Sequence, residues 1–180
     1  TGRLLISDSE VDEMSIYFTG DNIFSPTLSG SLVSTCSTTN IARTGFSNEP
    51  TGVAIDRIHN RVYFSDDNAK KVFEVSLGPD GIYCTADDVV TSVAFPTDTE
   101  DVAYGNNRLY IAGGTDAEVY VYDLGPNGFL GGGDDSLVTH WDTAILGFND
   151  LEGIGYNWDR GTLFIVSTVS SERYLGETTT

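Results

Sequence analysis

Short apolar or alternating runs, separated by turn residues, make up most of the chain from position 49 onward. In one unit these runs are Gly52–Ile55, Arg61–Ser65, Lys71–Ser76 and Val89–Phe95. Runs of this length bounded by Gly, Asn and Asp are typical of β-strands. No longer window has a convincing helical periodicity. The pattern therefore predicts an all-β fold.

This unit recurs along the chain. Gly52, Asp101 and Gly153 occupy corresponding positions, at intervals of 49 and 52 residues. Four short antiparallel strands in about fifty residues are typical of a β-propeller blade. We expect the small first strand to be innermost, the apolar second strand to be covered on both faces, and the Ser/Thr-rich fourth strand to form the outer edge. The expected blade repeats, within a single propeller domain or propeller segment spanning 1–180, are about 3–48, 49–97, 98–149 and 150–180.

The ends of the repeat predict incomplete blades. The first unit begins at a second-position strand, Arg3–Ser7, and the last ends after a third-position strand near Tyr174–Thr178. The chain thus holds about three and a half four-stranded blades, which do not close a ring alone. Unpaired strand edges recruit other strands. We expect self-association by strand sharing, as a dimer or a filament, with a fragment of a longer protein as the alternative.

One loop occurs twice and is rich in oxygen ligands. Leu77–Ser92 and Leu124–Thr139 both contain Gly-Pro-Asp/Asn-Gly, a spacer and an Asp-Asp pair. Carboxylate and amide oxygens are the ligands that Ca²⁺ prefers, although the spacing is not that of an EF-hand. The alternative is a polar hairpin in which these side chains cap turns. The candidate calcium ligands are Asp80, Asp87 and Asp88 in the first loop and Asn127, Asp134 and Asp135 in the second.

A second candidate site lies where the innermost strands begin. Asp98 and Glu100 correspond to Asp150 and Glu152, so these four carboxylates are expected to surround one mouth of a central channel. Such a ring repels itself unless cations or hydrogen-bond donors compensate. We expect either a metal ion at the channel mouth or hydrogen bonds from these carboxylates to amides of the neighbouring blade.

The charge narrows the possible partners. Twenty-seven acidic against nine basic residues give a formal net charge of -18, which disfavours nucleic acid and anionic lipid. No apolar run is long enough to span a bilayer. The acidic surface and the expected calcium indicate an extracellular or cell-surface protein. Cys36 and Cys84 are too few for a disulfide framework, and we expect them to be unpaired, with a bridge between neighbouring repeats as the alternative.

The blade sequences resemble a known group. Asp150–Tyr156, followed by Gly161–Val166, resembles the D-x-E-G-I-x-Y-D…G-x-L-Y/F-V blade signature, and Thr97–Tyr104 matches it as well. The signature belongs to bacterial extracellular β-propellers of the NHL-like and phytase-like/esterase-like groups, and the acidic loops resemble calcium loops of secreted repeat proteins. The resemblance covers nearly all of Arg3 to Glu177. It implies a calcium-binding propeller without implying an activity.

Catalytic motifs are absent from the sequence. It contains no G-x-S-x-G and no H-E-x-x-H. His59 and His140 are interpreted as surface residues, and the blade aromatics Tyr63, Tyr110, Tyr120, Tyr122 and Phe164 as core. We therefore favour a non-catalytic, calcium-stabilised, secreted propeller with a structural, adhesive or filament-forming role. The alternative is a metal-dependent propeller hydrolase, of lactonase or esterase type, that uses the channel-mouth carboxylates.

Overall fold

The computed structural model describes residues 38, 46–83, 85–169 and 172–180. The first expected blade, 3–48, lies almost entirely outside these residues. The same holds for both cysteines and for the candidate strand Arg3–Ser7. No helix in the described part of the chain is long and apolar enough to cross a membrane.

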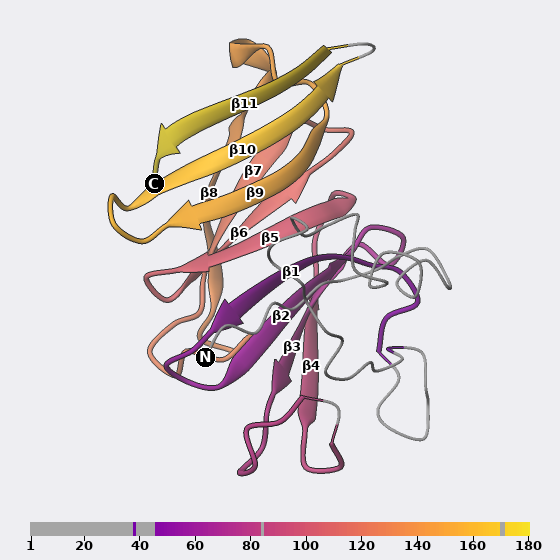
Figure 1. Ribbon diagram of the computed structural model, residues 1–180, viewed down its shortest axis with the longest axis vertical. Helices are drawn as coiled ribbons and strands as arrows, with labels where there is room; N and C mark the ends of the chain where they lie inside the picture. The colour runs from indigo at the N-terminus through magenta and orange to yellow at the C-terminus, as the bar shows by residue number, and fades with distance from the viewer. Residues whose placement is uncertain (1–37, 39–45, 84, 170–171) are drawn as a thin grey trace, which may run out of the picture.

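The described residues form three antiparallel sheets that fan out from their first strands (Figure 1). Each four-stranded sheet pairs its strands in sequence order, and the third sheet has three strands. The first sheet contains β1 (Pro50–Asp56), β2 (Arg61–Asp66), β3 (Lys71–Ser76) and β4 (Val89–Ala94). The second contains β5 (Thr99–Gly105), β6 (Arg108–Gly113), β7 (Glu118–Asp123) and β8 (Ser136–Asp142). The third contains β9 (Leu151–Asn157), β10 (Thr162–Val169) and β11 (Glu172–Thr179).

This architecture confirms the all-β fold and the four-stranded blades. The innermost strands β1, β5 and β9 contact one another in succession. Strand β2 is buried at every position, whereas β4 and β8 are largely exposed, as expected for outer strands. A short 3-10 helix at Ala144–Leu146 connects the second blade to the third and was not predicted.

The first hairpin of each blade turns where the sequence has Asn or Gly. Asn106 and Asn107 form a two-residue loop with φ of 53° and 61°. Asn60 and Gly161 adopt φ of 57° and 64° in the corresponding turns. Hairpins of this kind need positive φ, which Asn and Gly adopt most readily. The turn residues therefore position the inner pair of strands in every blade.

Two aromatic stacks hold successive blades together. Tyr63 of β2 stacks on Tyr104 of β5 at 5.4 Å between ring centroids. In the next interface, Tyr110 of β6 stacks on Tyr156 of β9 at 5.5 Å. Such pairs add about 0.5–1.5 kcal/mol beyond the burial of their area. Both stacks lie within the apolar clusters between blades.

The expectation that Phe164 is a core residue was wrong. Phe164 of β10 corresponds to Tyr63 and Tyr110, but its side chain is 38% exposed. The two tyrosines are covered because a following blade packs on them. No described residue covers the corresponding face of the third blade, where Val166 and Leu175 are exposed as well.

Candidate functional site

Carboxylates from all three described blades act on Glu100 near the start of the inner strands, at the right-hand ends of β5 and β9 in Figure 1. Glu100 lies at the centre of this group. Its side chain rests against Gly114, where an added Cβ would lie 2.8 Å from Glu100 Oε1. Burial, together with the negative charges of four further carboxylates, raises the pKa of Glu100 to about 7. The four are Asp67, Glu152, Asp98 and Asp150. We call these five residues the acidic mouth.

The other members of the acidic mouth have partners in their own blades. Asp98 accepts hydrogen bonds from Thr97 Oγ1 at 2.8 Å and from the Thr115 N–H at 3.3 Å. Burial raises the pKa of Asp98, but these hydrogen bonds outweigh it and leave the pKa below its ordinary value. Thr168 Oγ1 donates to Glu152 Oε1 at 2.8 Å and lies 3.5 Å from Asp150 Oδ2. The charges of Asp98, Asp150 and Glu152, the other three residues that the sequence suggested, thus reach Glu100, and that of Asp67, from the β2–β3 turn, does so as well.

Asp101, which the sequence did not single out as a site residue, makes a hydrogen bond between two inner strands. Asp101 of β5 accepts the Ile154 N–H of the third blade at 2.9 Å and the Val102 N–H at 2.8 Å. On its other side it lies so close to Gly52 of the first blade that a Cβ there would be 2.1 Å from Asp101 Oδ1. Burial raises the pKa of Asp101 to about 6, although the two N–H donors lower it. Asp101 therefore links all three inner strands.

In the first acidic loop, the predicted ligands bond to the loop's own backbone. Asp80 Oδ1 accepts the Ile82 N–H at 2.8 Å, and Asp87 Oδ2 accepts the Asp80 N–H at 3.4 Å. Asp88 Oδ2 accepts the Thr85 N–H at 3.0 Å. The Thr85 hydroxyl donates to Asp87 at 2.5 Å and is the main reason that the pKa of Asp87 is lowered.

The second acidic loop repeats this arrangement. Asn127 Oδ1 accepts the Phe129 N–H at 2.6 Å, and Asp134 Oδ2 accepts the Asn127 N–H at 3.0 Å. Asp135 Oδ2 accepts the Gly131 N–H at 2.7 Å. In both loops the three side chains therefore act as turn caps. No described group of three or more His, Cys, Asp or Glu residues is placed to hold a metal ion.

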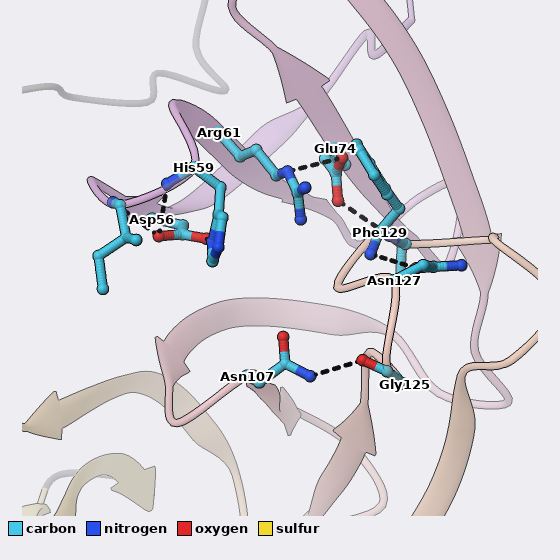
Figure 2. Close-up of polar contacts among 10 residues, drawn as sticks. Asp56, His59, Arg61, Glu74, Asn107, Gly125, Asn127 and Phe129 are labelled. Atoms are coloured by element: carbon cyan, nitrogen blue, oxygen red, sulfur yellow. Dashed lines mark hydrogen bonds and ion pairs between the residues drawn. The ribbon is translucent and has the colours of Figure 1, made fainter.

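The second loop also reaches back onto the preceding blade, which the sequence did not indicate (Figure 2). Leu130 is 1% exposed in the cluster between the first two blades, and its N–H donates to Glu74 Oε2 at 2.9 Å. Thr91 Oγ1 donates to the Leu130 carbonyl at 3.0 Å. The Arg61 guanidinium lies 3.6 Å from Glu74 Oε1 and 3.7 Å from the centre of the Phe129 ring. We call residues 124–135 the interblade strap.

Solved structures with a similar fold are β-propellers. A proposed 6-phosphogluconolactonase from Bacteroides uniformis matches with a TM-score of 0.50 and 10% identity, over 73% of this chain and 41% of its own. A PQQ-bound aldose sugar dehydrogenase from Streptomyces coelicolor matches with a TM-score of 0.46 and 12% identity, over 73% and 43% of the two chains. A glutaminyl cyclase from Myxococcus xanthus matches with a TM-score of 0.43 and 17% identity, over 69% and 46%.

These similarities bear on the fold alone. This chain spans less than half the length of each of these structures. No family model and no curated protein matches it. At such low identity the shared architecture does not carry an activity from one protein to the next. The described residues have a β-propeller-like fold made of antiparallel blades.

Proposed function

We propose that this chain is part of a cation-dependent propeller hydrolase, and that the acidic mouth, whose described carboxylates do not form a preformed metal-binding group, is drawn around a cation when one binds. The observation that carries the proposal is that the charges of four carboxylates from three blades act on Glu100 and, together with burial, raise its pKa to about 7. Like charges that act on a partly buried carboxyl group favour a bound proton or cation there. A cation in this place would bring the blades together at their inner strands and remove the repulsion.

The acidic mouth has the residue types that such a reaction needs. A bound divalent cation would polarise a carbonyl oxygen of an ester or lactone. Glu100, whose pKa is near neutral without the cation, is the group suited to moving a proton. Thr97, Thr115 and Thr168 hold Asp98, Asp150 and Glu152 in place through the hydrogen bonds described above. These positions make Glu100 the residue whose replacement tests the proposal most directly.

Hydrolysis of dihydrocoumarin and p-nitrophenyl acetate tests this function. The full chain should hydrolyse at least one of them, lose the activity in EDTA and regain it with excess Ca²⁺. Glu100→Gln should lower kcat/KM by at least about tenfold, or about 1.4 kcal/mol of transition-state stabilisation. Asp159→Asn, at an exposed turn on β9–β10, should leave it unchanged. No turnover of either ester, or turnover indifferent to EDTA, would reject the hydrolase.

A second candidate function is a self-associating structural module, and the third blade favours it. Its open face presents Phe164 and Val166, each 38% exposed, and Leu175, 71% exposed. Leu175 lies opposite Val166 in the β10–β11 ladder, so the three side chains form one patch. Exposed apolar patches on a sheet are typical of interaction sites. This candidate includes calcium at the two acidic loops and a location outside the cell.

A further inference from the structure

The hairpin turns at the opposite ends of the inner strands form a second shared surface. It consists of the β1–β2, β5–β6 and β9–β10 turns, at residues 57–60, 106–107 and 158–161. These turns lie on one side of the fan, at the left in Figure 1, away from the acidic mouth. We call this surface the hairpin rim.

The hairpin rim presents one exposed indole on a fixed aromatic base. Trp158 is 57% exposed, and its ring packs against Tyr156 at 5.1 Å and Tyr104 at 6.0 Å between centroids. Asn106 Nδ2 donates to the Tyr156 hydroxyl at 2.6 Å. Tyr104 stacks on Tyr63 of the first blade. Tyr156 and Tyr104 therefore hold Trp158 in place while leaving much of it uncovered, and Tyr63 of the first blade supports Tyr104 from behind.

A histidine oriented by a buried carboxylate continues this network. His59 Nδ1 lies 2.6 Å from Asp56 Oδ2, and the Asp56 side chain is 1% exposed while that of His59 is 49% exposed. Burial raises the pKa of Asp56. The hydrogen bonds from His59, from the Ile58 and His59 N–H groups and from Tyr104 outweigh it, so the pKa is lowered and Asp56 is ionised at neutral pH. No described residue hydrogen-bonds His59 Nε2, and the His59 side chain is about half exposed.

The size and chemistry of this surface select the ligand class. Its exposed large apolar residues are Ile58 and Trp158. A protein partner usually needs about 800 Å² on each side, whereas a Trp side chain buries about 150–250 Å². The surface therefore suits a small ring with one apolar face. The imidazole of His59 and the amide of Asn106, from two turns of the same rim, suit a ligand that carries many hydroxyl groups.

From this arrangement we propose that the hairpin rim binds a neutral carbohydrate. The C–H face of a sugar ring would stack on Trp158, because those hydrogens meet the negative face of the indole. His59 and Asn106 would hydrogen-bond its hydroxyls. The proposal is independent of the acidic mouth, because the two surfaces lie at opposite ends of the inner strands. A flat aromatic ligand is the competing occupant.

Tryptophan fluorescence tests the proposal, because the chain has only two tryptophans. In a Trp141→Phe background, emission from Trp158 is followed while cellohexaose, xylohexaose, mannohexaose or chitohexaose is added to millimolar concentration, with adenosine as the aromatic comparator. At least one hexasaccharide should shift the emission and saturate. By calorimetry, Trp158→Ala should weaken its binding by at least about tenfold, and His59→Ala should weaken it less.

The melting temperature of Trp158→Ala should stay close to that of the parent, since the indole is exposed, and this separates lost binding from lost folding. Leu175→Ala, at another exposed apolar residue, should bind like the parent. Saturation by adenosine alone, the absence of any saturable response, or equal binding by Trp158→Ala would each overturn the proposal.

Discussion

Single carboxylates in this protein have very different tasks, although they look alike in sequence. Asp101 accepts an N–H from the third blade and lies against Gly52 of the first, so it joins inner strands. Glu100, one residue earlier, points instead into the acidic mouth, where burial and four like charges raise its pKa. A β-bulge between Thr99 and Asp101 interrupts the pairing of β5 with β6 at Glu100 and re-aims its side chain. Adjacent positions in β5 therefore serve the fold and the candidate site.

The raised pKa of Glu100 predicts the pH dependence of stability. The unfolded chain releases this proton near pH 4, whereas the folded chain holds it to about pH 7. Because the folded state then binds more protons, stability should fall as pH rises across this window. In EDTA, Glu100→Gln should reduce this fall by about 1 kcal/mol, less than the full pKa shift implies because the group is partly exposed.

Urea unfolding at several pH values between 5 and 8 measures this effect. Asp159→Asn is the matched control, since it removes an exposed carboxylate outside the acidic mouth, and its profile should follow that of the parent. An unchanged slope in Glu100→Gln would show that Glu100 does not hold its proton in the folded state.

At the scale of elements, the repeated acidic loop is explained by how it folds and where it packs. Gly78 and Gly125, which begin the two Gly-Pro motifs, have φ of 26° and 63° and lie against Asp87 and Asp134. An added Cβ would meet these carboxylates at 2.2 Å and 2.7 Å. The recurring residues therefore preserve a capped turn. In the interblade strap, that turn places Leu130 in the apolar cluster between the first and second blades.

Replacing residues of the interblade strap should show how much its packing on the preceding blade stabilises the fold. Leu130→Ala should lower the free energy of unfolding by about 2–5 kcal/mol, because Leu130 is fully buried. Phe129→Ala should cost about 1 kcal/mol through its lost contact with Arg61. Ile82→Ala is the matched control. Ile82 holds the position in the first loop that Phe129 holds in the second, and it is 54% exposed. Urea titration checks all three, and equal losses in all of them would contradict a strap.

The strands and turns of the described blades follow from the sequence, whereas several contacts between blades do not. The bounds of β1 to β3 predicted from the alternating runs and the Asn or Gly turns agree with the observed bounds to within a residue or two, because these signals are local. The correspondence of Asp98 and Glu100 with Asp150 and Glu152 likewise identified four of the five residues of the acidic mouth.

Contacts between distant positions were less predictable. Asp67 joins the acidic mouth from a turn with no counterpart in the sequence argument, and His59 was interpreted as a surface residue although Asp56 fixes its ring. Leu130 gave no sign that it would reach the first blade. Each depends on the packing of one blade against the next, which a periodic pattern does not encode.

At the scale of the whole molecule, the aromatic stacks show how blades add to one another. Tyr104 stacks on Tyr63 between the first and second blades, and Tyr156 stacks on Tyr110 between the second and third. Phe164 holds the next position in this series and is exposed. The face that it shares with Val166 and Leu175 is therefore suited to a further blade of the same construction, or to a second copy of the chain.

This open face predicts concentration-dependent association of the full chain. Burial of the patch would contribute about 25 cal/mol for each Å² removed from water. Light scattering in calcium should show species larger than the 19.4 kDa chain, and Phe164→Asp should shift them toward the monomer. Ile145→Asp, at an exposed residue of the 3-10 helix, should not. A parent protein that remains monomeric at every concentration would remove the self-association candidate.

The net charge of -18 makes cation binding the central question for the whole molecule. Isothermal titration of the full chain with Ca²⁺ addresses it most directly, with the double variants Glu100→Gln/Glu152→Gln and Asp87→Ala/Asp134→Ala measured beside the parent. We predict that the parent binds Ca²⁺ and that the Glu100/Glu152 variant loses one site. The loop variant should keep that site. A parent that binds no Ca²⁺, or a Glu100/Glu152 variant that binds as the parent does, would contradict the acidic mouth as a cation site.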